Sequence, residues 1–378
     1  MKILYTNFHV GCGGGQDTYV RDLAVAMSRS HQVTVASPPG SHLSEKLRYA
    51  PGIETVEIHF KLRWNNFLRE TLKLRKLIET GRFDIVHVNG SADHRQVMLA
   101  IAGLPHRPEI IFTKHNTYAA HSLGNWLRAK FGTRLTIAVS DYVRDMLERK
   151  SAYRNVVVIK HGVRAVGQEA LNWDEIRTRR TALLGVNSAD AIVLGSAAGT
   201  GASKGWADLV AALMLLPPDL RSRFRVWLAG TDPSAAQRAM VSRCGLDEQV
   251  IFTGSLDSVQ DLLAVTDVSF VLSYHESLSY ACREAMVMGC PMLVSNVGGL
   301  PENVSNGVDG WIVPPRNASA IAQVLREIVA DPGRVRLMGH MAAMKSRSEF
   351  CFESFVAATH GVYMDALSVH LIASKQLA

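Results

Sequence analysis

Residues 268–302 read VSFVLSYHESLSYACREAMVMGCPMLVSNVGGLPE, and this stretch predicts the fold of the second half of the chain. Val268–Leu272 is a short apolar run of strand type, Tyr280–Met288 has helical periodicity, and Met292–Ser295 is a second short apolar run. A strand, a helix and a strand in this order predict parallel strands with a crossover helix. The polar residues from Ser273 onward therefore lie at the carboxyl ends of parallel strands, where α/β proteins bind ligands.

The same alternation extends outward through the whole chain and predicts an α/β fold of two doubly wound, Rossmann-like domains facing each other across a cleft. The remaining expected strands are Ile3–Thr6, Val33–Ala36, Thr55–His59, Ile85–Val88, Ile110–Thr113, Leu135–Ser140, Val156–Lys160, Ile192–Ala197, Arg225–Ala229 and Val250–Phe252. The remaining expected helices are Thr18–Ser28, Phe67–Ile78, Gln96–Ala102, Asp141–Arg149, Trp206–Leu215, Ala235–Arg243, Ser258–Val265, Ala318–Ala330 and a closing segment, Phe350–Ser374.

The length of 378 residues favours two domains over one compact core. The strand rhythm stops after His161-Gly162-Val163 and restarts at Ile192, with polar and charged residues between. We expect an N-terminal Rossmann-like domain over 1–165, a C-terminal Rossmann-like domain over 166–349, and a helical segment over 350–378 that packs back on the N-terminal domain.

The composition is that of a globular protein, with 47% hydrophobic and 20% charged residues. The five cysteines include no Cys-x-x-Cys pair, so neither a disulfide framework nor a zinc site is expected. The chain enters an apolar strand at its start without a signal-peptide pattern, and no uncharged stretch is long enough to span a bilayer. These features predict a cytoplasmic protein.

The charge is divided unevenly along the chain. Residues 1–165 carry a net charge of +11 and residues 166–378 a net charge of −4, which gives the overall +7. A basic excess confined to one domain favours an anionic partner for that domain, such as a membrane surface, a phosphorylated acceptor or nucleic acid. No nucleic-acid recognition motif accompanies it, so nucleic acid is not expected as a partner.

The first strand runs into a glycine-rich turn, Gly11-Cys12-Gly13-Gly14-Gly15, followed by a helix from about Gln16. Such a turn directs backbone N–H groups and the helix dipole toward an anion. A dinucleotide-binding fingerprint is excluded because Gln16 or Thr18 occupies the third glycine position and no acidic residue ends the second strand.

The loop after the strand Ile192–Ala197 carries a lysine, Lys204, immediately before a helix. The surrounding Gly199-Thr200-Gly201-Ala202-Ser203-Lys204-Gly205 is not a P-loop, because the order is Lys-Gly rather than Gly-Lys-Ser/Thr. We expect Lys204 to donate to a phosphate opposite the loop that carries Glu276.

Two carboxylates, Glu276 and Glu284, lie eight positions apart across a loop-to-helix transition. A carboxylate can accept hydrogen bonds from two hydroxyls of a pyranose or ribose at once. The backbone N–H groups at the start of the helix can hold a phosphate or sugar oxygen. This pattern suits a sugar nucleotide better than other ligands.

At this point the chain resembles family-4 retaining glycosyltransferases of the GT-B fold, of the lipopolysaccharide-core or related cell-surface glycan type. The resemblance rests on ordered motifs in both halves of the chain. They are Gly13–Gly15, His31–Val35, Thr113-Lys114-His115-Asn116, Ile159–Val163, Glu276, Glu284, Ala285-Met286, Gly289-Cys290-Pro291, Gly298-Gly299, Glu302 and Asn306–Pro314.

The resemblance implies a role for each matching residue. Glu276, Lys204 and His115 would act at the reaction centre, on the donor sugar, the leaving diphosphate and the transferred sugar with its acceptor. Glu284 would contact the nucleotide ribose. Further donor contacts would come from Gly14, Gly15, Ser277, Leu278, Ser279, Gly298, Gly299 and Leu300. The resemblance implies transfer of a hexose or N-acetylhexosamine with retention, no metal and no cofactor, and a nucleotide-diphosphate sugar as substrate, with a UDP-sugar favoured.

Two departures from the family pattern bear on the donor. The family often has an arginine where this chain has Gly199, so either another arginine, Arg164 or Arg283, supplies the second phosphate cation, or phosphate binding is weaker. The common Gly-Phe-Gly after the first glutamate is Ser277-Leu278-Ser279 here, which either narrows the sugar pocket or adds hydroxyl contacts.

The N-terminal domain of this family meets the acceptor, and two stretches of it here are basic and aromatic, Lys61–Arg75 and Trp126–Arg134. Either they are ordinary amphipathic helices or they lie on anionic lipid headgroups. We expect a lipid-linked or phosphorylated glycan acceptor, such as lipopolysaccharide core, and peripheral binding to an anionic membrane at the cytoplasmic face of the inner membrane. The alternatives are a non-hydrolysing nucleotide-sugar epimerase and a non-enzymatic protein that binds sugar nucleotides or glycans.

Overall fold

The computed structural model describes residues 1–11, 14–60, 64–164, 178, 180–182, 191–256 and 258–375. The chain forms two compact units. Unit 1 comprises Met1–Gly162 together with the segment from Glu353 onward, and unit 2 comprises Val163–Phe352. The boundaries therefore fall at 162/163 and 352/353, within three residues of those expected from the strand rhythm.

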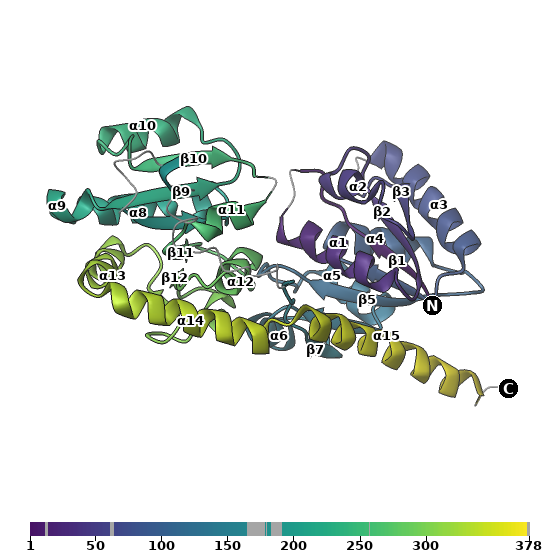
Figure 1. Cartoon of the computed structure of the whole chain (residues 1–378). Coiled ribbons are helices and arrows are strands. Elements are labelled where there is room, and N and C mark those ends of the chain that lie inside the picture. Colours follow the sequence, from purple (N-terminus) through teal and green to yellow (C-terminus); the bar gives the residue numbers. More distant parts are fainter. Residues whose placement is uncertain are drawn as a thin grey trace. The chain divides into compact units, whose positions relative to one another are not determined.

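Unit 1 is built on a seven-stranded parallel sheet with the order β3-β2-β1-β4-β5-β6-β7 (Figure 1). Its strands are β1 (Lys2–Thr6), β2 (Gln32–Ser37), β3 (Ile53–Glu57), β4 (Ile85–Val88), β5 (Glu109–Lys114), β6 (Leu135–Ala138) and β7 (Val156–Val158). Its helices are α1 (Gly15–Met27), α2 (His42–Leu47), α3 (Trp64–Gly81), α4 (Ser91–Ala100), α5 (Leu123–Phe131), α6 (Asp141–Lys150) and α15 (Phe352–Lys375), which begins at the last residue of unit 2.

The expected strands of unit 1 are all present. Helix α2 was not expected, and α5 overlaps the stretch Trp126–Arg134, for which an amphipathic helix was one of the two alternatives. Helix α2 spans only six residues, and its start is fixed by Ser41, whose hydroxyl accepts a hydrogen bond from the Ser44 N–H. Helix α5 begins in the same way at Ser122, which accepts from the Asn125 N–H. Its apolar side chains do not face the sheet, so it lacks the burial pattern of a core helix.

A chain of buried polar groups joins α15 to the sheet of unit 1. The Tyr363 hydroxyl donates to the Tyr5 hydroxyl (3.0 Å) and lies 2.6 Å from His87 Nδ1. His87 Nε2 lies 2.6 Å from Thr113 Oγ1, which is 3.2 Å from the Tyr19 hydroxyl. Since Tyr363 uses its only proton on Tyr5, His87 must donate from Nδ1 and accept at Nε2. Burial costs are thereby offset, and the network fixes α15 on unit 1.

Buried titratable groups, His87 of this network among them, predict that unit 1 loses stability in acid. Burial lowers the pKa of His87 and of His94 to about 3, so the unfolded chain binds protons that the folded chain does not, and stability is lost as the pH falls below 6.5. Between pH 7 and pH 5 each histidine costs about 2 kcal/mol. Burial raises the pKa of Asp93 to about 6, so the folded chain binds this proton more tightly than the unfolded chain. This offsets about 1 kcal/mol of the lost stability between pH 7 and pH 5.

For these three groups the expected loss in the free energy of unfolding between pH 7 and pH 5 is about 3 kcal/mol, and burial of His115, whose pKa is also lowered, increases it. Urea titration at both pH values measures it. The variant His121→Gln replaces an exposed histidine and should leave the pH dependence unchanged. Equal stability at the two pH values would contradict the neutral, buried assignment of His87 and His94.

Unit 2 is built on a six-stranded parallel sheet with the order β10-β9-β8-β11-β12-β13. Its strands are β8 (Ile192–Ser196), β9 (Phe224–Ala229), β10 (Val250–Gly254), β11 (Val268–Val271), β12 (Met292–Ser295) and β13 (Gly310–Val313). Its helices are α8 (Trp206–Met214), α9 (Pro218–Arg221), α10 (Ala235–Arg243), α11 (Val259–Ala264), α12 (Tyr280–Val287), α13 (Ala318–Ala330) and α14 (Pro332–Glu349), with short 3-10 turns η2 (Ala202–Lys204) and η3 (Leu300–Asn303).

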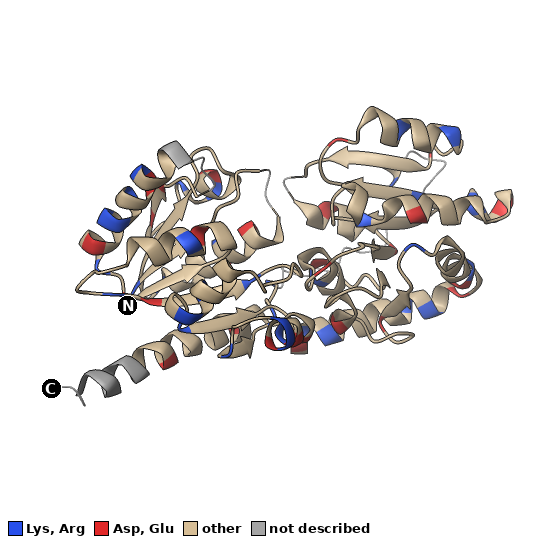
Figure 2. Cartoon of the chain, turned by 180° about the vertical axis from the view of Figure 1, so that it is seen from behind, with Lys and Arg blue, Asp and Glu red and all other residues tan. Residues whose placement is uncertain are grey.

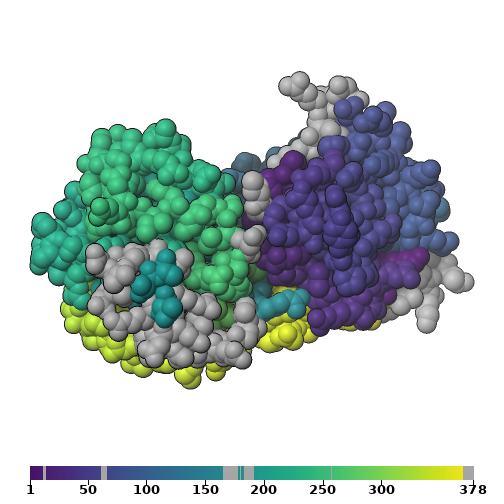
Figure 3. Space-filling view, turned by 45° about the horizontal axis from the view of Figure 1, so that its top comes forward, coloured from purple at the N-terminus to yellow at the C-terminus, as the bar shows by residue number. Residues whose placement is uncertain are grey.

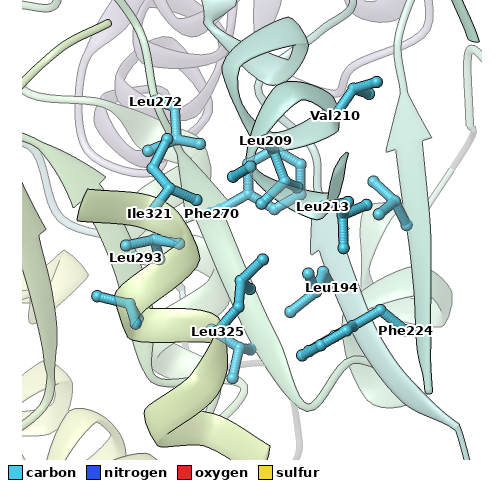
Figure 4. Packing of buried hydrophobic residues seen from close by; sticks show 14 of the residues in the cluster. Leu194, Leu209, Val210, Leu213, Phe224, Phe270, Leu272, Leu293, Ile321 and Leu325 are labelled. Carbon is cyan, nitrogen blue, oxygen red and sulfur yellow. The ribbon is translucent and has the colours of Figure 1, made fainter. Parts of the chain in front are cut away.

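The main core of unit 2 lies between the sheet and the packed pair α8 and α13 (Figure 4). Leu209 and Leu213 of α8 and Leu325 of α13 meet Phe270 of β11 in this core. In the space-filling view, the teal and green surface of unit 2 belongs to its first strands and helices, and the yellow-green surface along its lower edge belongs to its last helices (Figure 3). None of the described helices is both long and apolar enough to cross a membrane.

Strand β13 and helix α14 were not expected from the sequence. Strand β13 begins at Gly310, where a Cβ atom would lie 2.2 Å from the Met292 carbonyl oxygen, so only glycine permits this close pairing with β12. In both sheets the strand order reverses at one point, between β1 and β4 in unit 1 and between β8 and β11 in unit 2. Ligands of such folds bind outside the carboxyl ends of the strands at this reversal.

Candidate active site

In unit 2 the strand reversal brings two loops together, one after β8 and one after β11. Lys204 Nζ of the first loop donates to Glu276 Oε2 of the second at 3.3 Å. The Tyr274 N–H donates to the Ser203 carbonyl at 2.8 Å, so the backbones are joined beside the ion pair. The structure therefore places two of the sequence-predicted residues, 72 positions apart, in direct contact at the crevice of this sheet.

The loop that carries Lys204 is held in place by hydrogen bonds to its backbone. The Thr200 carbonyl accepts hydrogen bonds from Trp206 Nε1 at 2.9 Å and from Gln237 Nε2 at 2.8 Å. Gly205, directly after Lys204, has a φ of +69°, and a Cβ atom there would lie 1.8 Å from the Leu272 carbonyl oxygen. The close approach of this glycine to the end of β11 places Lys204 beside Glu276.

Gly205→Ala is expected to displace this loop and to lower the free energy of unfolding by at least about 2 kcal/mol, because alanine must adopt a left-handed conformation against a backbone oxygen. Gly201→Ala is the matched control in the same loop, since φ there is −58° and a Cβ would meet nothing within 4 Å. Chemical denaturation of both variants tests the difference. Equal stability would contradict the role given to Gly205.

The second loop turns sharply into α12. Ser279 has a φ of 84°, a conformation that non-glycine residues rarely adopt, and its hydroxyl accepts from the Cys282 N–H at 3.3 Å. Leu278 is fully buried beneath this turn. Ser277 is half-buried, and so is Glu284, which lies on α12 itself. Because strained backbone is retained mainly at functional sites, Ser279 marks the start of α12 as one.

A third loop, after β12, closes on the second. The Gly299 N–H donates to the Glu276 carbonyl at 3.2 Å, and Gly298 has a φ of 55°. Leu300 opens η3 and is buried. Buried Asn303 donates from Nδ2 to the Leu278 and Leu300 carbonyls at 2.5 and 3.0 Å. The glycine pair therefore lies beside Glu276, as its place in the sequence motif predicts.

Arg283 does not lie at this crevice as a surface cation. Its side chain is 1% exposed, its Nε donates to Asn303 Oδ1 at 2.8 Å, and its guanidinium lies 4.2 Å from the centroid of the Phe350 ring. This burial argues against the prediction that Arg283 binds phosphate, since the guanidinium is surrounded by the interior of unit 2. Desolvation by this burial also lowers the pKa of Arg283 to about 10.

Arg164, the other predicted phosphate cation, stacks on the Phe352 ring at 3.9 Å from its centroid and is half-buried. Arg316 is a cation that the sequence analysis did not indicate. Its guanidinium lies 4.3 Å from the centroid of the Tyr274 ring, and Tyr274 precedes Glu276 by two residues. Arg316 is exposed and has a φ of 57°, a second non-glycine residue in the left-handed region at this end of the sheet.

In unit 1 the glycine-rich turn leads from β1 into α1. Gly14 and Gly15 lie at the start of α1, and Cys12 and Gly13 lie outside the described residues. Buried Asn7, at the end of β1, donates to Asp17 Oδ1 and accepts from Gln16 Nε2, both at 2.7 Å. Asp17 also lies 3.4 Å from His9 Nδ1. These bonds, which the sequence did not predict, fix the two sides of the turn to each other.

His115 follows β5 at the carboxyl edge of the unit 1 sheet. Its Nε2 lies 2.9 Å from Asn89 Oδ1, and its ring packs edge-on against Tyr19. Asn89 uses its Nδ2 to donate to the Thr6 and His87 carbonyls, so its oxygen is the acceptor and His115 carries a proton on Nε2. Desolvation, with a smaller effect of Lys114 and neighbouring histidines, lowers the pKa of His115 well below its ordinary value. His115 is therefore a neutral imidazole.

Asn89-Gly90-Ser91 follows a predicted strand, so this loop could have been suspected of carrying functional residues. Its contact with His115 could not have been predicted. Asp93 accepts from the Asn89 N–H at 2.9 Å and from Thr6 Oγ1 at 2.7 Å. Among the described residues, no group of three or more His, Cys, Asp or Glu side chains is arranged to hold a metal ion.

Comparison with known proteins follows the division into units. Residues 13–165 match the family model described as Glycosyltransferase Family 4, and residues 190–331 match the model described as Glycosyl transferases group 1. Together the two matches cover most of the chain. Both units therefore match glycosyltransferase domain families.

Curated relatives match shorter regions. A D-inositol 3-phosphate glycosyltransferase of Streptomyces avermitilis is 32% identical over 170 residues, which is 43% of this chain and 36% of that protein. An N-acetyl-alpha-D-glucosaminyl L-malate synthase of Bacillus anthracis is 30% identical over 128 residues, 34% of each chain. The matched regions thus span about a third of the length of these relatives.

Solved structures match the whole chain. Anabaena Alr3699/HepE in complex with UDP has a TM-score of 0.82 at 19% identity and covers 97% of this chain and 100% of its own. WaaG, a glycosyltransferase involved in lipopolysaccharide biosynthesis, has a TM-score of 0.74 at 16% identity and covers 96% of this chain and 99% of its own. These likenesses confirm the predicted GT-B fold of two Rossmann-like domains.

Proposed function

We propose that this chain, whose two units match glycosyltransferase domain families, transfers a hexose or an N-acetylhexosamine from a nucleotide-diphosphate sugar to an acceptor hydroxyl. The observation that carries the proposal is the contact between Lys204 and Glu276 at the strand reversal of unit 2, beside the start of α12. Both side chains are partly exposed there, at 32% and 15%. Their opposite charges suit the two ends of such a donor, the diphosphate and the sugar hydroxyls.

Each of the neighbouring groups then takes one part of the donor. Lys204 neutralises the leaving diphosphate, together with N–H groups at the start of α12 and at Gly298. Glu276 accepts hydrogen bonds from the donor sugar, and Glu284 from the ribose. The nucleotide favoured is UDP. Structures of HepE with UDP and with UDP-glucose support UDP as the first nucleotide to test.

The reaction that we propose is transfer with retention and without a metal ion. The bond between the sugar C1 and the β-phosphate oxygen breaks, and a bond between C1 and the acceptor oxygen forms on the same face. The acceptor proton passes to the departing phosphate oxygen, so charge and atoms balance. His115, a neutral imidazole held by Asn89, would position the transferred sugar or the acceptor hydroxyl through hydrogen bonds.

The acceptor that we propose is a lipid-linked or phosphorylated cell-surface glycan, such as lipopolysaccharide core, met at the cytoplasmic face of a membrane. The net charge of +11 in residues 1–165 supports an anionic acceptor or surface for unit 1. Helix α3 alone carries four basic and two acidic residues along its length (Figure 2).

A panel of UDP-, GDP- and ADP-sugars, scored for nucleotide release with and without glycan acceptors, tests the proposal. We expect one sugar nucleotide to release its nucleotide faster when an acceptor is present. We also expect NMR to show the same anomeric configuration for the transferred sugar in the product as in the donor. Interconversion of a free sugar nucleotide without any acceptor would indicate an epimerase instead. Binding of sugar nucleotides without turnover would indicate a non-enzymatic binding protein.

A further inference from the structure

A cavity of about 370 Å³ opens in unit 1 beside α5. It lies between this helix and the two loops that precede β6 and β7. Trp126, Ala129 and Lys130 of α5 line it, and their spacing places them on one face of the helix. His115 follows β5 at the carboxyl edge of the same parallel sheet, whereas these loops lie at its amino edge. The cavity is therefore distinct from the site where transfer is proposed.

Hydrogen bonds fix the walls of this cavity to one another. The Thr136 N–H donates to the Asn155 carbonyl at 2.8 Å, and Asn155 Nδ2 donates to the Arg134 carbonyl at 3.4 Å. The Thr133 hydroxyl donates to the Arg128 carbonyl at 2.8 Å, which holds the end of α5 against the loop before β6. The cavity is therefore formed before a ligand enters, as sites for small molecules usually are.

The lining of the cavity is basic. It includes Lys130, Arg134 and Arg154, and none of the described residues that line it is acidic. Arg154 donates to the Ser151 and Tyr153 carbonyls at 2.8 and 3.2 Å. In the described part of the chain, no hydrogen-bonding or ionic partner is found for the side chain of Lys130 or of Arg134. Cations without a counter-charge attract an anion, and two of them match the charge of a phosphate group.

A buried hydroxyl also belongs to this lining. Tyr153 lines the cavity although it is only 2% exposed. Its hydroxyl has no hydrogen-bond partner among the described residues, and neither has Nε of buried Arg128. Burial raises the pKa of Tyr153, so the hydroxyl keeps its proton and can donate it. Few buried polar groups in native proteins lack a partner, and a ligand oxygen would supply the one that is missing here.

Trp126 adds an exposed aromatic surface to the cavity. It is 44% exposed, and its ring packs edge-on against Phe131 with the ring centroids 6.0 Å apart. Such a ring can pack against the apolar face of a sugar. The lining also contains the polar side chains of Thr133, Thr136 and Asn155, which suit sugar hydroxyls. A ligand with a phosphate, hydroxyls and one apolar face matches all parts of this lining.

We propose that the cavity beside α5 binds a phosphorylated sugar, either free or as a unit of a larger glycan. Lys130 and Arg134 bind the phosphate, and the Tyr153 hydroxyl donates to one of its oxygens. The sugar ring stacks on Trp126. Because the cavity and His115 lie at opposite edges of the sheet, the sugar bound here is not the one that is transferred. The inference therefore goes beyond the proposed function and does not depend on it.

Calorimetric titration of mannose 6-phosphate into the full chain tests this inference without a sugar nucleotide. We expect mannose 6-phosphate to bind, and mannose and inorganic phosphate to bind at least about 10-fold more weakly. Lys130→Gln with Arg134→Gln should weaken binding of mannose 6-phosphate about 30-fold, since two charge-assisted contacts are lost. Trp126→Ala should weaken it about 10-fold and leave the binding of inorganic phosphate unchanged.

Tyr153→Phe separates a ligand-binding role from a structural one. It should weaken binding of mannose 6-phosphate about fivefold without lowering the free energy of unfolding, because the hydroxyl that it removes has no partner in the fold. The matched control is Lys46→Gln with Arg29→Gln, two exposed cations elsewhere in unit 1, which should bind as the unaltered chain does. Absence of binding by the unaltered chain, or an affinity unchanged by substitution of the two cations or of the tryptophan, would overturn the proposal.

Electrophoresis through gels that contain a mannan with terminal mannose 6-phosphate identifies the source of the sugar. Retardation that phosphatase treatment of the mannan abolishes would assign the cavity to a phosphorylated unit of a glycan. Binding of mannose 6-phosphate without retardation would assign it to a free sugar phosphate. All variants should keep the UDP affinity of the unaltered chain. If the unaltered chain binds mannose 6-phosphate but no UDP, the proposed function fails and this site stands.

Discussion

Glu276→Gln is expected to reduce glycosyl transfer by about 10³-fold in kcat/KM while leaving the fold intact. The side chain is partly exposed at the strand reversal and, among the described residues, forms a hydrogen bond and ion pair with Lys204, so glutamine of the same size fits without a cavity. What is lost is a charge-assisted acceptor for the donor sugar, which is worth most while charge develops at C1. Turnover with the best sugar nucleotide of the panel and thermal unfolding of the same preparation measure both effects.

The matched control for this prediction is Glu248→Gln, which removes an exposed carboxylate from the same unit at a position away from the crevice. It should retain the activity of the unaltered chain. Activity of Glu276→Gln within about threefold of the unaltered chain would refute the role of Glu276, since such a change corresponds to less than 1 kcal/mol of transition-state stabilisation.

Lys204→Met is expected to lower kcat/KM by about 10²- to 10³-fold and to weaken binding of the free nucleotide diphosphate as well. Methionine preserves much of the aliphatic length but removes the ammonium that neutralises the diphosphate. Because the diphosphate is present in the ground state and gains charge as the bond breaks, both KM and kcat should change. Steady-state kinetics and nucleotide binding by calorimetry give the two quantities.

Lys204→Arg should retain part of the activity, since it keeps the charge. The control Arg243→Met, which removes an exposed cation from α10, should retain all of it. If Lys204→Met binds UDP as tightly as the unaltered chain, another cation neutralises the diphosphate. Arg316, stacked on Tyr274 two residues before Glu276, would then be the first residue to substitute.

The sheets could be predicted from the sequence because buried parallel strands are short, β-branched apolar runs, and every expected strand is present. Strand β13 was not predicted because it begins with Gly310. This glycine permits close backbone contact with β12 but adds no apolar side chain to the sequence pattern. Helix α2 was not predicted because a hydroxyl cap at Ser41 starts it and it has no periodic buried face of useful length. For α5 the sequence indicated an amphipathic stretch but not its start, which the hydroxyl of Ser122 caps.

The part of the site that could be predicted consists of residues that directly follow strands which are neighbours in the sheet. Lys204 and Glu276 follow strands that become neighbours at the reversal of the sheet, so strand order alone predicts their contact. Arg283 shows the limit of this reasoning. Its position next to Glu284 suggested the crevice, but adjacent helical residues face different directions, and its side chain points into the interior against Asn303 and Phe350.

The sequence could point to the loop that contains Asn89, but not to its hydrogen bond with His115. The support of His115 depends on hydrogen bonds between residues that are distant in the chain, from Thr6 through Asn89 to His115, and beside them a network that reaches Tyr363 of the C-terminal helix. No periodic pattern encodes such pairs, because the partners are far apart in the sequence.

The central claim is that the crevice of unit 2 holds the diphosphate through Lys204 and the sugar through Glu276. Calorimetric titration of UDP and of the matching UDP-sugar into the unaltered chain, Glu276→Gln and Lys204→Met tests it most directly. The account predicts that Glu276→Gln keeps its UDP affinity but loses the extra affinity contributed by the sugar, whereas Lys204→Met loses affinity for both ligands. Equal affinities for both ligands in all three proteins would contradict it.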